Sequence, residues 1–70
     1  MNKEKLEAVM KERGFDKETL AKATRLTARG FEQRVDGDVE FNLSEIVFIS
    51  KALSLTCAEI EEIFFDQKVL

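Results

Sequence analysis

Residues 16–35, DKETLAKATRLTARGFEQRV, read as two short helices joined by a tight corner. Only residues 24–26 separate the two helices, so these are expected to cross at a steep angle. Arg29, Gln33 and Arg34 are expected to point outward from the second helix. The apolar side chains expected to face the core are Leu20, Ala21, Ala23, Leu26, Phe31 and Val35.

Signals for the ends of helices lie within this stretch and on both sides of it. Gly14 is expected to end the preceding helix, because glycine readily takes the left-handed conformation found after a helix C-terminus. Asp16 and Thr27 offer side-chain oxygens to the free amides of the two helices that follow them. Gly37 is the expected turn residue of the next break, and Phe41 is expected to enter the core.

Two capping boxes mark the helices of the C-terminal half. Asn42 precedes Glu45, and Thr56 precedes Glu59, by the three residues that this motif requires. The fold class is therefore expected to be all-α, a compact single domain of five helices. The expected helices cover about residues 3–13, 17–23, 28–35, 43–53 and 57–65.

Length and composition limit the kinds of protein this chain can be. Its 70 residues suffice for one domain with one modest core. The chain has no proline and three glycines, which favours helices over many-turned strands. It shows neither a long apolar run nor a signal-peptide core, so we expect a cytoplasmic protein with no membrane contact.

The chemistry-bearing side chains are few. With no histidine and one cysteine, the chain lacks a Ser/His or Cys/His pair and the ligands of a usual zinc site. We therefore expect no enzymatic activity, no cofactor, no metal and no small-molecule substrate. Cys57 is expected to be inert because no resolving partner lies near it in the sequence.

Charge is divided unevenly along the chain, whose formal net charge is −3. Residues 17–35 carry five basic and two acidic side chains, whereas residues 36–66 carry eight acidic side chains and Lys51. This polarity favours a polyanionic partner for the helix pair. The acidic total argues against tight nonspecific binding.

The order and spacing of these features resemble the lambda-repressor-like helix-turn-helix family, in particular the short Cro and repressor proteins of phages of Gram-positive bacteria. Residues 20–23, LAKA, resemble the first helix of the family motif. Thr27 is similar to the residue that caps the recognition helix, and Phe31 to its buried anchor. Further similar pieces are Val35-Asp36-Gly37, Glu40-Phe41, Ser44-Glu45-Ile46, Glu59-Ile60, Phe64-Phe65 and Lys68-Val69.

The chain departs from the family pattern at several positions. Arg25 stands at the motif corner, where the family usually has glycine; a left-handed residue there costs on the order of 1 kcal/mol. Gly30 lies inside the expected recognition helix. Asp36, Asp38 and Glu40 put negative charge where relatives often carry lysine or asparagine.

The resemblance implies sequence-specific binding of double-stranded DNA through the major groove, by a small transcriptional regulator of the phage-repressor type. The implied base-reading residues are Ala28, Arg29 and Gln33. Arginine pairs with two acceptors of guanine, glutamine pairs with adenine, and alanine touches a thymine methyl. The implied phosphate contacts are Lys17, Thr27 and Arg34.

One such helix reads only a few base pairs, so a homodimer is expected, at least on DNA. Val47 and Phe48 widen the apolar face of their helix, either as additional core or as a dimer surface. The acidic residues Glu59, Glu61 and Glu62 are expected to form a solvated helix face. An alternative function is a protein–protein interaction module that keeps this scaffold but has weak or lost DNA binding.

Overall fold

The computed structural model describes residues 1–65, which fold into five helices with no strand among them. This result confirms the all-α class and the number of helices. The helices expected first and last each end one residue earlier than expected, and Lys68-Val69 lies outside the described residues. The helices are α1 (Lys3–Glu12), α2 (Lys17–Ala23), α3 (Ala28–Val35), α4 (Leu43–Leu53) and α5 (Cys57–Phe64).

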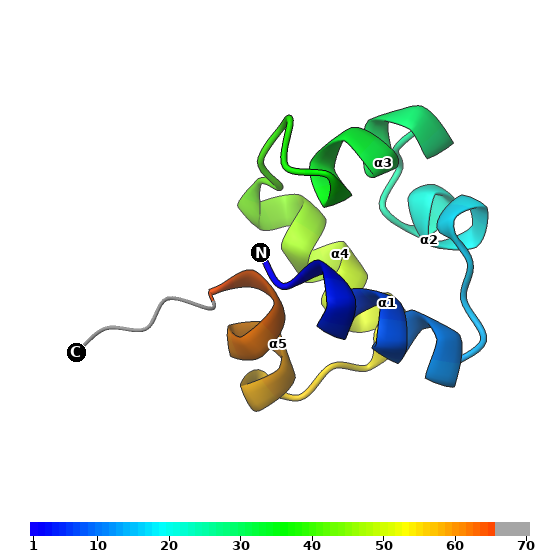
Figure 1. Cartoon of the computed structure of the whole chain (residues 1–70). Coiled ribbons are helices and arrows are strands. Elements are labelled where there is room, and N and C mark those ends of the chain that lie inside the picture. The colour runs from blue at the N-terminus through cyan, green and yellow to red at the C-terminus, as the bar shows by residue number, and fades with distance from the viewer. Residues whose placement is uncertain (66–70) are drawn as a thin grey trace.

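The helices are arranged so that α3 lies along one edge of the molecule. Figure 1 shows α1 and α4 in the middle, α5 toward one end and the pair α2–α3 toward the other. α2 packs against both α3 and α4, while α1 packs against α5. The backbone amide of Asn2 also donates to the carbonyl of Ile63 at 2.7 Å, which ties the N-terminus to α5.

A single apolar core joins all five helices. Burying these side chains supplies the main favourable term in folding. Phe41, expected to enter the core, is half-buried; its ring meets Phe31 edge-on at 5.9 Å and Phe64 at 5.7 Å between centroids. The buried apolar residues are Leu6, Val9, Met10, Leu20, Ala21, Phe31, Val35, Ile49, Leu53 and Ile63.

One expectation about α2 is wrong. Ala23 is exposed, and Thr24 is buried in its place with 2% of its surface accessible. At about 100° per residue, Thr24 lies between Leu20 and Ala21 on the helix surface, whereas Ala23 lies on the other side of Leu20, outside this buried arc. The Thr24 hydroxyl donates to backbone carbonyls of α2, with Oγ1 2.9 Å from the carbonyl oxygen of Ala21.

Every helix begins at a capped residue. In each case a side-chain oxygen accepts a hydrogen bond from the amide three residues further on, which satisfies one of the free amides of the first turn. The two expected capping boxes are both complete, since Glu45 and Glu59 also accept from the amides of Asn42 and Thr56. The five cap residues are Asn2, Asp16, Thr27, Asn42 and Thr56.

Left-handed residues follow within two positions of the ends of four helices. These are Gly14, Arg25, Gly37 and Ser54, with φ of 79°, 61°, 89° and 55°. After each helix, two backbone amides fold back onto its last carbonyls in the Schellman pattern. Gly14 and Gly37 were expected, and Arg25 keeps the left-handed corner that the resemblance implies. Ser54 carried no comparable signal in the sequence.

Arg25 combines backbone strain with a favourable contact. Its Cζ lies 5.6 Å from the centre of the Phe48 ring, a cation–π contact worth about 0.5–1 kcal/mol at an exposed site. Arg25→Ala loses this contact and keeps the left-handed strain, whereas Arg25→Gly loses the contact and relieves the strain. We expect the glycine variant to be more stable than the alanine variant by about 1 kcal/mol in urea unfolding.

Ser54 provides the matched control for this prediction. Ser54 is also left-handed, and its hydroxyl takes part in no hydrogen bond within residues 1–65. Ser54→Gly is therefore expected to be more stable than the wild type by up to about 1 kcal/mol. Equal unfolding midpoints for Arg25→Gly and Arg25→Ala would show that the corner is not strained.

Arg13 connects the end of α1 to the junction between α4 and α5. Its Nη1 donates to the carbonyl of Leu53 at 2.7 Å, and its Nη2 donates to Oε2 of Glu59 at 2.8 Å. The hydrogen bond from the Thr56 amide, and then that from Arg13, lowers the pKa of Glu59. The amide and hydroxyl of Thr19 likewise lower the pKa of Asp16.

These lowered values make stability depend on pH. A carboxyl whose pKa is lower in the folded state stabilises the fold above its unfolded pKa, about 4.3 for glutamate, and this contribution is lost as pH falls through the folded value. Glu59→Gln should therefore lose stability less steeply below that pH than the wild type, in urea unfolding at neutral and acid pH. Glu61→Gln, on the exposed side of α5, is the control and should follow the wild type.

Candidate nucleic-acid interface

The inner face of α3 fixes which side chains form its outer face. Phe31 and Val35 are buried, with 1% and 7% of their surface accessible. At 100° per residue, Arg29 and Gln33 lie opposite these two anchors. Arg29 is exposed and Gln33 half-buried, so the outer face expected from the sequence is present.

The outer side chains of α3 are available for contacts. Within residues 1–65, neither the Arg29 guanidinium nor the Gln33 amide makes a hydrogen bond or an ion pair. Ala28 is exposed one position before Arg29, at the first residue of the helix. The structure therefore places all three residues on one short helix, with Ala28 and Arg29 exposed and Gln33 half-buried.

Lys17 and Thr27 stand at the N-termini of α2 and α3. The Lys17 ammonium lies 3.4 Å from Oε1 of Glu32, and both side chains are more than half exposed. An exposed pair of this kind contributes about 0–1 kcal/mol, so Lys17 can exchange Glu32 for another anion at little cost. The Thr27 hydroxyl oxygen accepts from the amide of Gly30 at 2.9 Å, which leaves its proton free to donate.

Arg34 does not point outward as expected. Its side chain is 20% exposed, and its Nε donates to Oε1 of Glu45 at 3.0 Å. Its Nη1 also donates to the carbonyl of Gly30 at 2.9 Å. The reason is tertiary: Arg34 is next to Val35 on the side of α3 that faces the N-terminus of α4, where Glu45 completes a capping box. Arg34 thus links α3 to α4.

Gly30 has no side chain, which leaves room for the Thr27 hydroxyl and for the Arg34 guanidinium beside it. A Cβ at this position would lie 3.1 Å from Oγ1 of Thr27 and 3.5 Å from Nη1 of Arg34. The first distance is shorter than an ordinary contact, so a Cβ here requires the Thr27 hydroxyl that caps α3 to shift by a few tenths of an ångström. Glycine is a poor helix former, and the close approach of Thr27 is a local reason for its presence at position 30.

The ion pair between Arg34 and Glu45 predicts that substitutions of Arg34 and of Arg29 have different effects on the free energy of unfolding. Arg34→Met leaves the Glu45 carboxylate buried without its cation, and we expect the free energy of unfolding to fall by about 1–3 kcal/mol. Arg34→Met combined with Glu45→Gln should recover part of this loss. Arg29→Ala, on the exposed face, should stay within about 0.5 kcal/mol of the wild type. Urea unfolding of the four proteins tests this ordering, and a stable Arg34→Met variant would contradict the structural role of the pair.

The acidic segment behind α3 is partly neutralised. Asp36 forms an exposed ion pair with Lys3 of α1 at 3.0 Å. The hydrogen bond to Asp36 raises the pKa of Lys3 above its ordinary value. Asp38 and Glu40 are exposed and have no ion pair in the part of the chain that the structure describes. The repulsion that this segment exerts on a polyanion is therefore reduced at Asp36, the acid nearest to α3.

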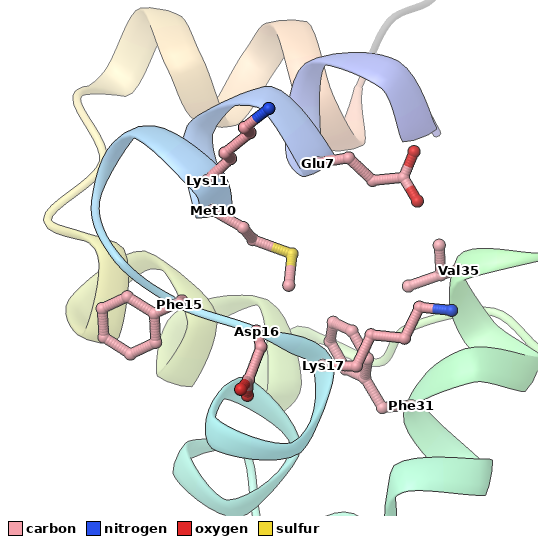
Figure 2. A pocket seen from close by; sticks show the side chains of 8 residues that line it. All are labelled: Glu7, Met10, Lys11, Phe15, Asp16, Lys17, Phe31 and Val35. Atoms are coloured by element: carbon pink, nitrogen blue, oxygen red, sulfur yellow. The ribbon is translucent and has the colours of Figure 1, made fainter.

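A cavity of about 230 Å³ lies between α1 and the pair α2–α3. Figure 2 shows Met10 directed into it, with Glu7 and Lys17 at its border and Phe31 and Val35 along α3. Sites for small molecules usually measure about 300–1,000 Å³. This cavity is smaller, and it separates α1 from the helix that carries Arg29.

The apolar surface of α4 differs in part from the sequence prediction. Val47 is 41% exposed, as a dimer surface requires, whereas Phe48 is half-buried beside Arg25. Leu43 and Phe65, which the sequence did not single out, are 73% and 53% exposed. The spacing of Leu43 four residues before Val47 on one helix was the signal that would have found it.

Comparisons with family models, with curated proteins and with solved structures gave no match for this chain. No helix within residues 1–65 has the length and apolar character that crossing a membrane requires. The function proposed next therefore depends on the geometry and chemistry of the side chains described above.

Proposed function

We propose that the chain is a small regulator that binds a specific site on double-stranded DNA through a lambda-repressor-like helix-turn-helix. In this proposal α2 and α3 form the motif, and α3 enters the major groove. The observation that carries it is the outer face of α3, where Arg29 and Gln33 stand opposite the buried Phe31. Neither polar side chain has a partner within the described residues.

The chemistry of this face suits the reading of base edges. The Arg29 guanidinium has parallel N–H groups that match O6 and N7 of guanine. The Gln33 amide can donate to N7 and accept from N6 of adenine, and Ala28 can touch a thymine methyl. Because Arg29 and Gln33 lie one turn apart, they address neighbouring base pairs.

The proposed grip on the DNA backbone uses fewer residues than the sequence implied. Lys17 offers its ammonium, and Thr27 offers a hydroxyl at the start of α3, where the helix dipole favours phosphate. Arg34 is left out of this proposal because its Nε and Nη1 are occupied by Glu45 and Gly30. Few phosphate contacts imply a moderate dependence of affinity on salt.

Repression in this proposal is steric, because a protein bound at a promoter excludes polymerase. One copy of α3 reaches only a few base pairs, which gives little specificity. Two copies on half-sites about one helical turn apart would read enough sequence for a regulator.

Selection from a pool of randomised duplexes at two salt concentrations tests this proposal. We expect enrichment of a short palindromic site, with weaker binding at the higher salt. Arg29→Ala should flatten the preference at one base position and lose about 1–3 kcal/mol of binding free energy. Lys11→Ala, which removes the same charge from the last turn of α1, is the control and should keep the base preference.

An unchanged site preference in Arg29→Ala would remove this residue from the interface. If no sequence is enriched even at low salt, the alternative of an interaction module without DNA binding takes precedence. The exposed apolar residues of α4 and α5 are the observation that favours this alternative.

A further inference from the structure

One face of α4 carries exposed apolar side chains and ends at Lys51, and the acidic residues Asp38 and Glu40 precede the helix in the sequence. Leu43, Val47 and Lys51 follow one another at intervals of four residues, so they form a single stripe along the helix. Leu43 is 73% exposed and Val47 is 41% exposed. A shallow apolar depression runs beside the stripe, between Ile46 on α4 and Phe65 after α5.

The charges at the ends of this α4 stripe lack partners in the described chain. Asp38 and Glu40 precede the N-terminus of α4, and Lys51 lies in its last turn. None of the three forms an ion pair within residues 1–65. Lys51 is also the one basic side chain between residues 36 and 65, which places a single positive charge at the far end of an otherwise acidic half.

We propose that the α4 stripe is the contact surface between two copies of this chain, with the two α4 helices antiparallel across a two-fold axis at Val47. Val47 then faces Val47 of the second copy, and Leu43 lies against the aliphatic stem of Lys51. The Lys51 ammonium reaches Glu40 of the second copy. An isologous contact requires a surface that complements itself, and an apolar centre with opposite charges at its ends meets this requirement.

Charge complementarity favours a second copy over an unrelated helix as the occupant. In the antiparallel arrangement each Lys51 meets the acidic end of the other α4. A parallel arrangement would place the two lysines together and the two acidic ends together, which is unfavourable. The stripe is short, so the interface belongs to the small, weak class, below about 1,200 Å² of buried area.

This proposal deepens the proposed function, which already places two copies on one DNA site, by naming the surface through which the two copies meet; that surface does not include α3. A weak dimer that is negligible at low concentration becomes effective when two copies occupy adjacent half-sites, since the second contact is then intramolecular. If the chain binds no DNA, the dimer is still measurable in solution at high protein concentration.

Sedimentation of the full chain from micromolar to millimolar concentration tests the surface. We expect the wild type to shift from monomer to dimer, and Leu43→Ser combined with Val47→Ser to raise the dimer Kd at least about tenfold. Circular dichroism confirms that this variant is folded. A wild type that stays monomeric, or a variant that dimerises as well as the wild type, would overturn the proposal.

Charge reversal tests the antiparallel arrangement. Lys51→Glu and Glu40→Lys should each weaken the dimer several-fold, and the chain carrying both changes should regain wild-type dimerisation. Failure of the double variant to recover would contradict the pairing of Lys51 with Glu40.

A cross-link tests the position of the two-fold axis. In a chain with Cys57→Ser, Val47→Cys should form a disulfide-linked dimer under mild oxidation, because the two introduced thiols face each other. Glu18→Cys in the same background places an exposed thiol on α2 and should remain monomeric. Equal cross-linking of the two variants would overturn the arrangement. These dimer measurements contain no DNA. If the wild type binds no DNA, the proposed function fails, but the dimer result still stands.

Discussion

Burial of the Phe31 ring is the constraint on which the rest of the structure depends. Phe31 is 1% exposed and its ring meets Phe41 edge-on, and Phe41 in turn meets Phe64, the last residue of α5. One side chain of α3 is therefore held by contacts that extend across the molecule. With Phe31 fixed, the rotation of α3 about its axis is fixed, and Arg29 and Gln33 must face outward. A helix of eight residues has little stability alone, so this anchor is also what keeps α3 folded.

The sequence was most informative where structure is determined locally. Caps such as Asp16 and Asn42 were predictable because a helix N-terminus needs an acceptor within three residues, and that acceptor is visible in the sequence. Gly14 and Gly37 were predictable because glycine tolerates positive φ. The exposed position of Arg29 followed from the helical period once Phe31 was assigned to the core.

Apart from Ala23, whose place on α2 was misassigned, the error at Arg34 occurred where a residue meets a partner from another helix. Arg34 has the same periodic signal as a solvated residue, and only the position of Glu45 at the start of α4 makes it a structural one. The pairing of Asp36 with Lys3 likewise joins residues far apart in the sequence. Tertiary pairing of this kind leaves no trace in local propensity, so the members of a site are less predictable than its scaffold.

The distribution of paired charges sharpens the proposed mode of binding. Of the basic residues in the helix pair, Arg34 is engaged by Glu45 and Lys17 weakly by Glu32. Lys22, Arg25 and Arg29 form no ion pair within residues 1–65, and the rest of the chain has a net negative charge. The net negative charge limits general attraction to polyanions, so the proposed function relies mainly on contacts of Arg29 and Gln33 to bases.

The most direct test of the central claim is the pattern of amide chemical-shift changes when the labelled protein is titrated with its selected duplex. The claim predicts the largest changes at residues 27–33 and at Lys17, with small changes on the exposed side of α5. Changes confined to α4 and α5, or no changes on α3 at saturating DNA, would contradict it.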